Sequence, residues 1–257
     1  MNINELLQIA ADAGKIMLEN GAETYRVEET IIRICTAYGE PNTESFVTPT
    51  GIITSIQSFN NRTISITKRI TKRTVNLEKI KRINDLSRSI SHNWMSLEDF
   101  KCELSKINKV PRYSFKISVL CASMSASFFT LLFGGNFKDA IVSFFIGTII
   151  YKTSSILGQI NINDFFINML GGAITASIAS ISVFFDIGTN LDKIIIGSIM
   201  LLVPGLAITN AIRDTLAGDL VSGVARTIEA FFVAIALAIG AGLVLKIWVA
   251  YFGGNLI

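Results

Sequence analysis

The chain has little of the residues that most metal sites and active sites need. Of its 257 residues one is histidine, His92, and three are cysteines, Cys35, Cys102 and Cys121. One histidine without a Cys-x-x-Cys pair leaves too few ligands for a zinc site and no base for a Ser-His-Asp triad. We interpret His92, which lies among serine and asparagine residues, as a surface residue. The odd, scattered cysteines argue against a disulfide framework and are typical of a reducing compartment. A Gly-rich phosphate loop is also absent, so we predict neither a metal nor another cofactor.

Charge is scarce as well, and mostly in one part of the chain. Charged residues make up 17% of the sequence, against about 25% in soluble domains, and the mean hydropathy is +0.51. Residues 1–112 contain 16 of the 23 Lys and Arg and 13 of the 20 Asp and Glu, whereas residues 113–257 contain seven of each. The net charge of +3 therefore belongs to the first part and does not indicate a nucleic-acid partner. We predict a soluble domain over residues 1–112 and a helical transmembrane domain over residues 113–257.

The first part carries the periodicities of a small α/β (α+β) domain. Apolar residues at helical spacing predict two helices before residue 40. Alternating residues then predict three strands, over Glu44–Thr48, Ile52–Phe59 and Thr63–Ile70. Asn60 and Asn61 are expected to form a hairpin turn between the last two strands. Two further helices are expected to begin at the capping residues Asn76 and Ser96.

Nine basic residues, against two acids, lie in the run from Arg62 to Arg88, which covers the third expected strand and the helix after it. They are Arg62, Lys68, Arg69, Lys72, Arg73, Lys79, Lys81, Arg82 and Arg88. One interpretation is a site for a nucleotide or another anion, or for anionic lipid headgroups. The other is a solvated face on the cytoplasmic side. No aromatic residues interleave with the basic ones, which favours the solvated face and argues against nucleic acid.

The second part contains five apolar runs that are candidates for transmembrane helices. A transmembrane helix needs about 20 mostly apolar residues. The five runs are Ile117–Gly134, Ala140–Leu157, Phe165–Phe185, Ile194–Ile212 and Leu220–Trp248. Lys152 interrupts the second run, so this span is either transmembrane or re-entrant. The fifth run is longer than a bilayer requires, so it is tilted, broken or begins outside the hydrocarbon. We predict a membrane domain of about five transmembrane helices.

Small and hydroxylated residues at helical intervals predict where these helices pack together. The expected ridges are Gly172, Ala176 and Ser180 on the third run, Ala230, Ala234, Ala238 and Gly242 on the fifth, and Ser123, Ser127 and Thr130 on the first. Each ridge is therefore expected to face the bundle rather than lipid.

Basic residues before the first run predict the orientation of the chain in the cell (cytoplasmic) membrane. Lys101, Lys106, Lys109, Arg112 and Lys116 precede it, and such residues stay on the cytoplasmic side. The N-terminal domain is therefore expected in the cytoplasm, and five spans would place the C-terminus outside. The first twenty residues lack an apolar h-region, so we expect no signal peptide.

Charged and polar residues interrupt the last two runs and form the candidate site. A charge at membrane depth costs roughly 2.5–3.5 kcal/mol, and a chain that keeps several uses them on a solute, an ion or each other. The candidates for substrate binding or proton coupling are Asn210, Arg213, Asp214, Asp219, Arg226 and Glu229. An arginine can bind a substrate carboxylate through its fork of donors, and an acid can receive an ammonium group or a proton.

Two features of this segment bear on how the candidates work. Pro204 removes a helical hydrogen bond from the fourth run, and transporters build binding sites at broken helices. Arg226 and Glu229 are three residues apart on one helix, a spacing at which they could pair. The alternative is an internal ion-pair network that only locks two helices together.

Several stretches of the sequence resemble the threonine/serine exporter-like family. They are Gly21–Thr30, Phe46–Gly51, Leu202–Asp214, Ala217–Asp219 and Gly223–Ala230. The resemblance covers essentially the whole chain, in order. It implies secondary export of small polar carboxylates without an ATP-binding motif.

By the same resemblance, some residues of the cytoplasmic domain are candidates for function. They are Glu23, Tyr25, Arg26, Glu29, Thr48 and Thr50. The alternative for the first four is an exposed helix start, with Arg26 and Glu29 spaced to form an ion pair.

The resemblance also implies a partner. Full-length members of the family join this module to a second, smaller one of about four spans. The sequence ends at Ile257, after its fifth predicted span, so it resembles the larger subunit of a split form. A separate small membrane protein of about four transmembrane helices would then complete the exporter, and we expect an oligomer in the lipid bilayer. Succinate is the reported cargo of such a split system, and the resemblance does not choose between succinate, threonine and serine.

The sequence therefore leaves three functions to compare. The first, which we favour, is a subunit of a secondary transporter exporting a small polar carboxylate, and not an enzyme. The second is a membrane-anchored sensor that binds an anionic ligand through its cytoplasmic domain. The third is a membrane-anchored enzyme centred on residues 48–51, which lacks a recognisable nucleophile–base spacing.

Overall fold

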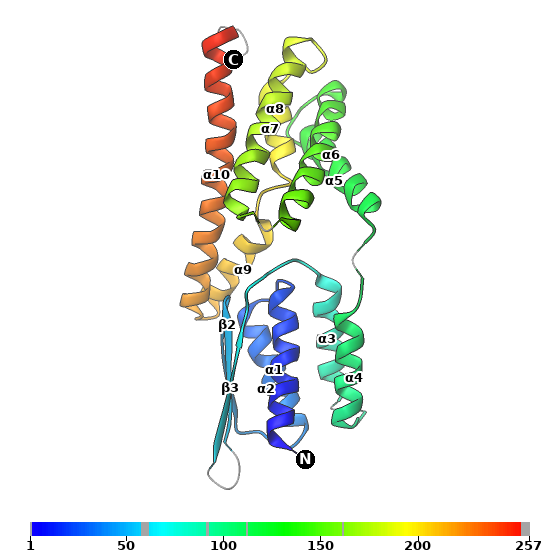
Figure 1. The fold of residues 1–257 in the computed structure, drawn as a ribbon, viewed down its shortest axis with the longest axis vertical. Helices are drawn as coiled ribbons and strands as arrows, with labels where there is room; N and C mark the ends of the chain where they lie inside the picture. The colour runs from blue at the N-terminus through cyan, green and yellow to red at the C-terminus, as the bar shows by residue number, and fades with distance from the viewer. Residues whose placement is uncertain (1, 58–61, 91–92, 112, 161, 253–257) are drawn as a thin grey trace. The chain divides into compact units, whose positions relative to one another are not determined.

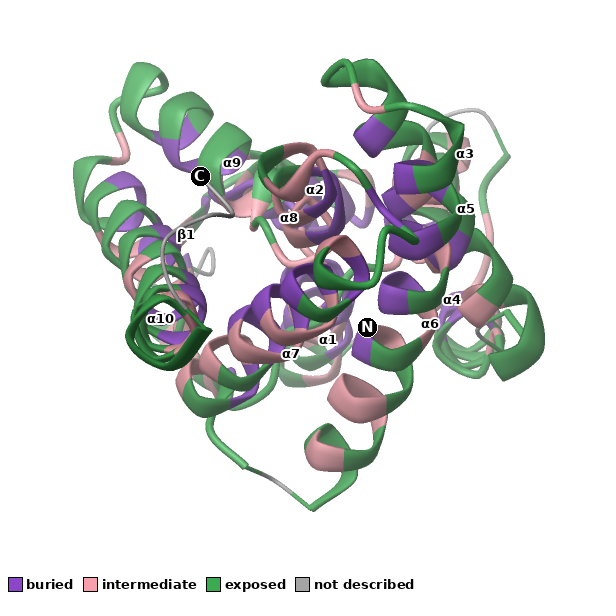
Figure 2. Cartoon of the chain, turned by 90° about the horizontal axis from the view of Figure 1, so that it is seen from above, coloured by how far each residue is buried: buried purple, intermediate pink, exposed green. Residues whose placement is uncertain are grey.

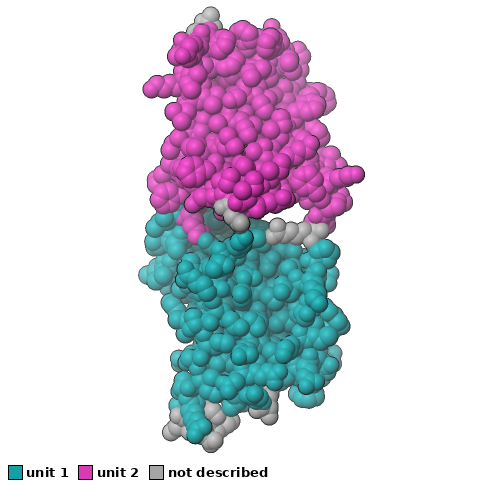
Figure 3. All heavy atoms as spheres, viewed as in Figure 1, with its two compact units in different colours: residues 1–112, 205–228 teal, residues 113–204, 229–257 magenta. Residues whose placement is uncertain are grey.

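The computed structural model describes residues 2–57, 62–90, 93–111, 113–160 and 162–252. It divides the chain into two compact units (Figure 3). Unit 1 consists of residues 1–112 and 205–228, and unit 2 consists of residues 113–204 and 229–257. The break after residue 112 lies where the sequence analysis places the domain boundary. Residues 205–228, which were expected in the membrane domain, belong instead to unit 1 because they pack against its first helices.

Unit 1 contains a small antiparallel sheet and six helical segments. Its elements are α1 (Ile3–Glu19), α2 (Thr24–Ala37), β1 (Thr43–Thr48), β2 (Gly51–Gln57), β3 (Thr63–Arg69), α3 (Leu77–Ser89), α4 (Leu97–Asn108), α9 (Gly205–Leu216) and the first nine residues of α10 (Leu220–Phe252). The strands pair in the order β1-β2-β3. Helices α1 and α2 lie against the sheet, and α3 and α4 lie on the other side of α1 (Figure 1).

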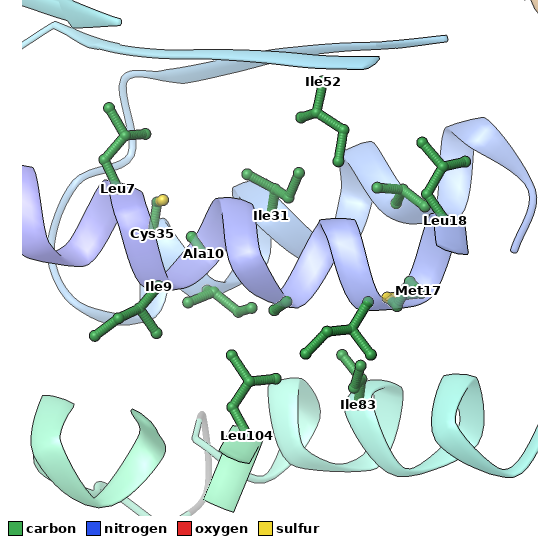
Figure 4. Packing of buried hydrophobic residues seen from close by; sticks show 14 of the residues in the cluster. Leu7, Ile9, Ala10, Met17, Leu18, Ile31, Cys35, Ile52, Ile83 and Leu104 are labelled. Atoms are coloured by element: carbon green, nitrogen blue, oxygen red, sulfur yellow. The ribbon is translucent and has the colours of Figure 1, made fainter. Parts of the chain in front are cut away.

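The core of unit 1 lies on both sides of α1 (Figure 4). Leu7 points toward the sheet, where Ile52 of β2 is fully buried, whereas Met17 points toward Ile83 of α3. Leu104 of α4 is also buried on this side of α1, away from the sheet. Each such side chain contributes about 1.5–3 kcal/mol when it is fully buried. The helical spacing of the apolar residues in the sequence thus places α1 at the centre of the unit.

Local signals at the helix starts act as the sequence predicts. The side chains of Asn76 and Ser96 each accept a hydrogen bond from a backbone N–H three residues on, and begin α3 and α4. Each cap supplies an acceptor that the first turn of a helix otherwise lacks. The expected hairpin turn at Asn60 and Asn61, and His92, lie outside the described residues.

The described residues of unit 2 form helices and the connections between them, without a strand. It contains α5 (Phe115–Leu132), α6 (Phe137–Gln159), α7 (Asp164–Phe184), α8 (Leu191–Ile199) and α10 from residue 229 on. Among the described residues, four helices are long and apolar enough to cross a membrane, namely α5, α6, α7 and α10. The sequence analysis expected five.

The expected span over Ile194–Ile212 accounts for the difference. The chain leaves α8 after Ile199 and starts α9 at Gly205, directly after Pro204. Proline has no N–H to donate and its ring clashes with the preceding turn, so the helix cannot continue through it. The nine residues of α8 span about 14 Å, which is half of a hydrocarbon core. The prediction of one helix here is therefore wrong.

The excess length of the last run also has an explanation. Helix α10 has 33 residues, and its first nine belong to unit 1. The remaining residues, from Glu229 to Phe252, are enough to cross a bilayer of about 30 Å. A single helix therefore contributes to both units.

Hydroxyl groups join α5 to α6. Ser123 Oγ lies 2.7 Å from Thr148 Oγ1, and Thr130 Oγ1 donates to Ser143 Oγ over 2.6 Å. Ser127 donates to a backbone carbonyl of α6. The prediction that Ser123, Ser127 and Thr130 share a packing face is confirmed.

The small residues of α7 and α10 give a mixed result. Gly172, Ala176 and Ser180 are buried as predicted, and a side chain at Gly172 would lie 2.6 Å from the carbonyl oxygen of Leu237. On α10, Ala230 is buried as predicted, but further along the buried residues are Ala236, Leu237, Gly240 and Ala241, whereas Ala234, Ala238 and Gly242 are exposed. The predicted ridge of α10 is therefore wrong from residue 234 on. Gly240 decides the face, because only a residue without a side chain fits against the backbone of Met169. Figure 2 shows the resulting pattern of buried and exposed faces.

Candidate functional site

The polar residues predicted from the last two apolar runs gather in unit 1, around the start of α2. Asp214 is fully buried, and the exposed fractions of Asn210 and Arg226 are 4% and 5%. Glu23, from the turn before α2, is 8% exposed. The sequence analysis treated the first three as charged or polar groups inside membrane helices. In the structure each of them bonds to the backbone of one of residues 21–24.

Asp214 is the central residue of this cluster. Its Oδ1 accepts a hydrogen bond from the backbone N–H of Thr24 over 3.1 Å, and Thr24 is the first residue of α2. Glu23 occupies the N-cap position of α2 but makes no capping hydrogen bond with its side chain. Asp214 therefore supplies the cap from a distant part of the chain. A carboxylate at this position also interacts favourably with the helix dipole.

Arg226 is the buried cation of the cluster. Its Nε lies 2.9 Å from Asp214 Oδ2, a contact whose distance makes it an ion pair although its angle falls outside hydrogen-bond geometry. Its Nη2 donates to the carbonyl oxygen of Ala22 over 2.9 Å. Asp219 accepts a hydrogen bond from the Thr24 hydroxyl over 3.2 Å. Charges from α9, the α9–α10 turn and α10 thus converge on three consecutive residues, 22–24.

A second ion pair lies further out. Arg213 Nη1 is 2.5 Å from Glu23 Oε1, and the other oxygen of Glu23 is 3.3 Å from Arg26 Nε. The Arg213 side chain is 53% exposed. Water therefore screens this pair, and we expect it to contribute much less than the buried one.

The turn between α1 and α2 is held in the same way. Asn210 Nδ2 donates to the carbonyl oxygen of Gly21 over 2.9 Å. Gly21 has φ of +95°, a conformation that residues with a side chain rarely adopt. Ser222 at the start of α10 donates to the carbonyl oxygen of Val47 in β1. Helices α9 and α10 are therefore fixed to the α1–α2 turn and to the sheet.

Glu28 joins the cluster from the next turn of α2. Its Oε1 accepts a hydrogen bond from the Val47 N–H over 2.8 Å. Burial raises the pKa of the Glu28 carboxyl, the Val47 hydrogen bond opposes this, and the charges of Asp219 and Asp214 raise the pKa further.

The remaining candidates of the first domain lie around the cluster or apart from it. Arg26 is exposed and donates to the hydroxyl of Tyr25 over 3.2 Å. The expected pair of Arg26 with Glu29 is wrong, since Arg26 pairs with Glu23 and Glu29 pairs with Arg33. In both pairs the residue of opposite charge lies three or four positions away along the chain, a spacing that helix geometry allows as well as the expected one.

Thr48 and Thr50 contribute to the β1–β2 turn. Their hydroxyl oxygens lie 3.4 Å apart, and the Thr48 hydroxyl donates to the carbonyl oxygen of Gly51 over 3.3 Å. These contacts close a tight turn, and the structure does not bring the two hydroxyls into the cluster around Asp214.

Arg226 forms its buried ion pair with Asp214, an acid of α9. Glu229 is half-buried and is the first residue of α10 that belongs to unit 2. Among the described residues, no group of three or more His, Cys, Asp or Glu side chains is placed to hold a metal ion.

Comparison with known proteins places this arrangement in a family. The family model of ThrE, threonine/serine exporter, matches residues 8–248. The chain belongs to the threonine/serine exporter family. This is a family of membrane exporters and not of enzymes, and with its four apolar helices the chain is a multi-pass membrane protein.

Two relatives show how this member of the exporter family compares in length. It is 26% identical to the "Threonine/serine exporter" of Corynebacterium glutamicum, over 93% of this chain and 50% of that protein. It is 24% identical to the "Probable succinate transporter subunit YjjP" of Escherichia coli, over 94% of each chain. The chain thus spans half the length of the first relative and nearly all of the second. No solved structure matches it.

Two residues of the cluster in this threonine/serine exporter-family chain were missed by the sequence analysis. Thr24 and Glu28 both lie in the stretch Gly21–Thr30 that resembles the family. A threonine directly after an expected turn was a signal for the start of a helix. Glu28 gave no comparable signal, because its partner, Val47, lies on a strand 19 residues away.

Proposed function

We propose that the chain is one subunit of a secondary transporter that exports a small polar carboxylate across the cytoplasmic membrane. The observation that carries this proposal is the family match over residues 8–248. The names of the relatives make threonine, serine and succinate the solutes to test. The sensor alternative has no support from the family, and we do not propose it.

We propose that a second membrane protein, of about four transmembrane helices, completes the exporter. Two observations support this. The chain spans only half of the Corynebacterium glutamicum exporter, and the Escherichia coli relative, which it matches over 94% of both chains, is named a subunit. We further propose that residues 1–112 are cytoplasmic, which is supported by the basic residues Lys101, Lys106 and Lys109 before α5 and Lys116 in its first turn.

For the cluster around Asp214 we propose a lock that holds α9 and the start of α10 to α2. Two observations support this structural role. Asp214 pairs with Arg226, and each of them forms a hydrogen bond to the backbone of residues 22–24. A solute would have to break these contacts to bind there. Within the lock, Glu28 is the group we propose for proton coupling, because its pKa is raised and it contacts β1.

Reconstitution tests the proposed transport. The chain is placed in proteoliposomes alone and together with the candidate small membrane protein, and efflux of labelled threonine, serine and succinate is measured. We expect flux of one class of solute only when both proteins are present. Absence of flux for all three solutes, with both proteins folded, would refute the transport function.

Glu28→Gln tests the proposed proton coupling in the same vesicles. We expect flux through this variant to lose its response to an imposed proton gradient. Glu29→Gln is the matched control, because Glu29 is the next residue of α2 but is exposed and pairs with Arg33. An unchanged response in Glu28→Gln would remove Glu28 from the coupling mechanism.

A further inference from the structure

Unit 2 contains a cavity whose lining includes none of the residues of the cluster around Asp214. Its volume is about 580 Å³, within the range of small-molecule sites. It lies between α5, α6 and the connection that follows α8. The lining residues are Tyr113, Ile117, Ser118, Cys121, Ala122 and Ser125 from or just before α5, Ile150, Tyr151 and Ser154 from α6, and Leu201 and Leu202 after α8.

The walls of this cavity are apolar with hydroxyl groups and have no charged side chain among them. Ser118, Ser125 and Ser154 supply aliphatic hydroxyls, and Tyr113 and Tyr151 supply phenolic ones. A hydroxyl both donates and accepts hydrogen bonds, so such walls can solvate an ammonium and a carboxylate alike. They cannot neutralise a net charge. A solute with two ionised carboxylates would lose its hydration on entering the cavity and would find no cationic side chain to pair with. Burying an unpaired charge in an apolar site has a high cost in free energy.

The wall formed by Leu201 and Leu202 adds a preference for positive charge. These residues come directly after the end of α8, where the last carbonyl groups lack helical donors. Two of these carbonyls, of Ser198 and Ile199, accept from the N–H groups of Leu201 and Leu202. The carbonyl end of a helix carries a partial negative charge. This wall therefore favours an ammonium group over a second carboxylate.

We propose that this cavity is the solute site of the exporter, and that it takes a small solute without net charge that carries both an ammonium and a carboxylate group. The proposal rests on the transport function proposed above and deepens it. It selects threonine and serine over the succinate dianion. It also separates two tasks, since the cluster in unit 1 locks helices and the cavity in unit 2 binds the solute.

The native cysteines allow a direct test, because Cys121 lines the cavity. Cys102 is exposed in unit 1. Cys35 is fully buried, and burial raises the pKa of its thiol to about 11, so it reacts slowly. In Cys102→Ser, labelling by a small maleimide therefore reports on Cys121. In Cys121→Ser, the same reaction reports on Cys102 and serves as the control.

The rate of labelling is measured with threonine, serine or succinate present, on the chain reconstituted with its candidate partner. We expect threonine or serine at ten times its Kd to slow the reaction of Cys121 about tenfold, and succinate to leave it unchanged. The reaction of Cys102 should not respond to any solute. Protection by succinate alone would overturn the selectivity, and no protection in vesicles that transport would show that the solute binds elsewhere. Because labelling is measured without flux, these outcomes are distinct from a failure of transport itself.

Filling the cavity gives a second test. Ala122→Leu narrows it, whereas Ala238→Leu adds the same bulk at an exposed position of α10. We expect Ala122→Leu to abolish both flux and protection of Cys121 and Ala238→Leu to retain them. Ser154→Ala removes only one hydroxyl, so it keeps the test informative if Ala122→Leu misfolds, and it should weaken protection by threonine. Full flux and protection in Ala122→Leu and Ser154→Ala would overturn the proposal.

Discussion

Removal of the Asp214 carboxylate is the perturbation whose effect can be worked out most fully from the structure. In Asp214→Ala, Arg226 stays 5% exposed but loses its carboxylate, and the N–H of Thr24 loses its acceptor. Breaking a buried ion pair from one side costs about 3–5 kcal/mol, and losing an N-cap costs about 1 kcal/mol. We therefore expect a loss of about 4–6 kcal/mol in the free energy of unfolding. Domains are stable by about 5–15 kcal/mol, so unit 1 would lose a large share of its stability.

A double-mutant cycle separates the ion pair from the cap. Asp214→Asn keeps an oxygen for the Thr24 N–H and removes the charge, so its cost should be about 3–4 kcal/mol. Arg226→Gln in the same chain removes the positive charge that Asp214 faced. The double variant should therefore lose less than the sum of the two single variants, by about 1–3 kcal/mol. Arg213→Gln is the matched control, because its pair with Glu23 is half exposed and should contribute at most about 1 kcal/mol.

The measurement is unfolding of the purified chain in mixed micelles, followed by loss of helical circular dichroism as the denaturing detergent is increased. Limited proteolysis at each step identifies whether unit 1 opens first. The reasoning is refuted if Asp214→Asn costs less than about 1 kcal/mol, or if the two single costs simply add. Either result would mean that the pair does not hold the helices together.

Three further predictions follow from other contacts. Because the pKa of Glu28 is raised in the folded protein, its stabilising contribution is complete below the ordinary value of 4.5 and is lost as the pH rises through the raised one. Glu28→Gln should therefore raise the melting temperature at pH 7 and give no advantage at pH 4, and equal differences at both values would contradict this. Asp139, fully buried at the start of α6, accepts hydrogen bonds from the N–H groups of Thr189 and Asn190. Asp139→Ala should lower the free energy of unfolding in micelles by about 3 kcal/mol or more, and a loss below 1 kcal/mol would contradict this. Gly240→Ala places a methyl group 1.9 Å from a carbonyl oxygen of α7 and should reduce the yield of folded protein, whereas Gly242→Ala, with open space around it, should not; equal yields would show that α7 and α10 pack otherwise.

The sequence was sufficient where the signal is local. Asn76 and Ser96 begin helices because their side chains bond to residues three positions away, and such a pattern is visible in any short stretch. Pro204 was recognised as a break in hydrogen bonding, but we underestimated it. We expected a helix continuing past it, because the apolar run from residue 194 to 212 fits a span by composition alone. Composition does not show that the residues after the proline belong to unit 1.

The sequence was insufficient where contacts join distant residues. Two acids, Asp219 and Glu229, lie within two helical turns of Arg226. Sequence spacing alone therefore favours them over Asp214 as its partners. The partner is decided by packing of α9 beside α10, which no periodicity encodes. The same holds for the face of α10. Alanine occurs on several of its sides, and the face that packs is selected by Gly240, whose importance depends on the backbone of α7.

The cap that Asp214 places on α2 also determines when the protein can finish folding during synthesis. The two residues that meet there, Thr24 and Asp214, are separated by 190 positions. A ribosome adds about 5–20 residues per second, so the cap emerges roughly 10–40 s after the helix that needs it. Throughout this interval the start of α2 must wait while α5 to α8 are delivered to the membrane. A nascent chain whose last helices fail to fold would leave the start of α2 without this cap. The contact thus makes the earliest part of the chain depend on the folding of the latest.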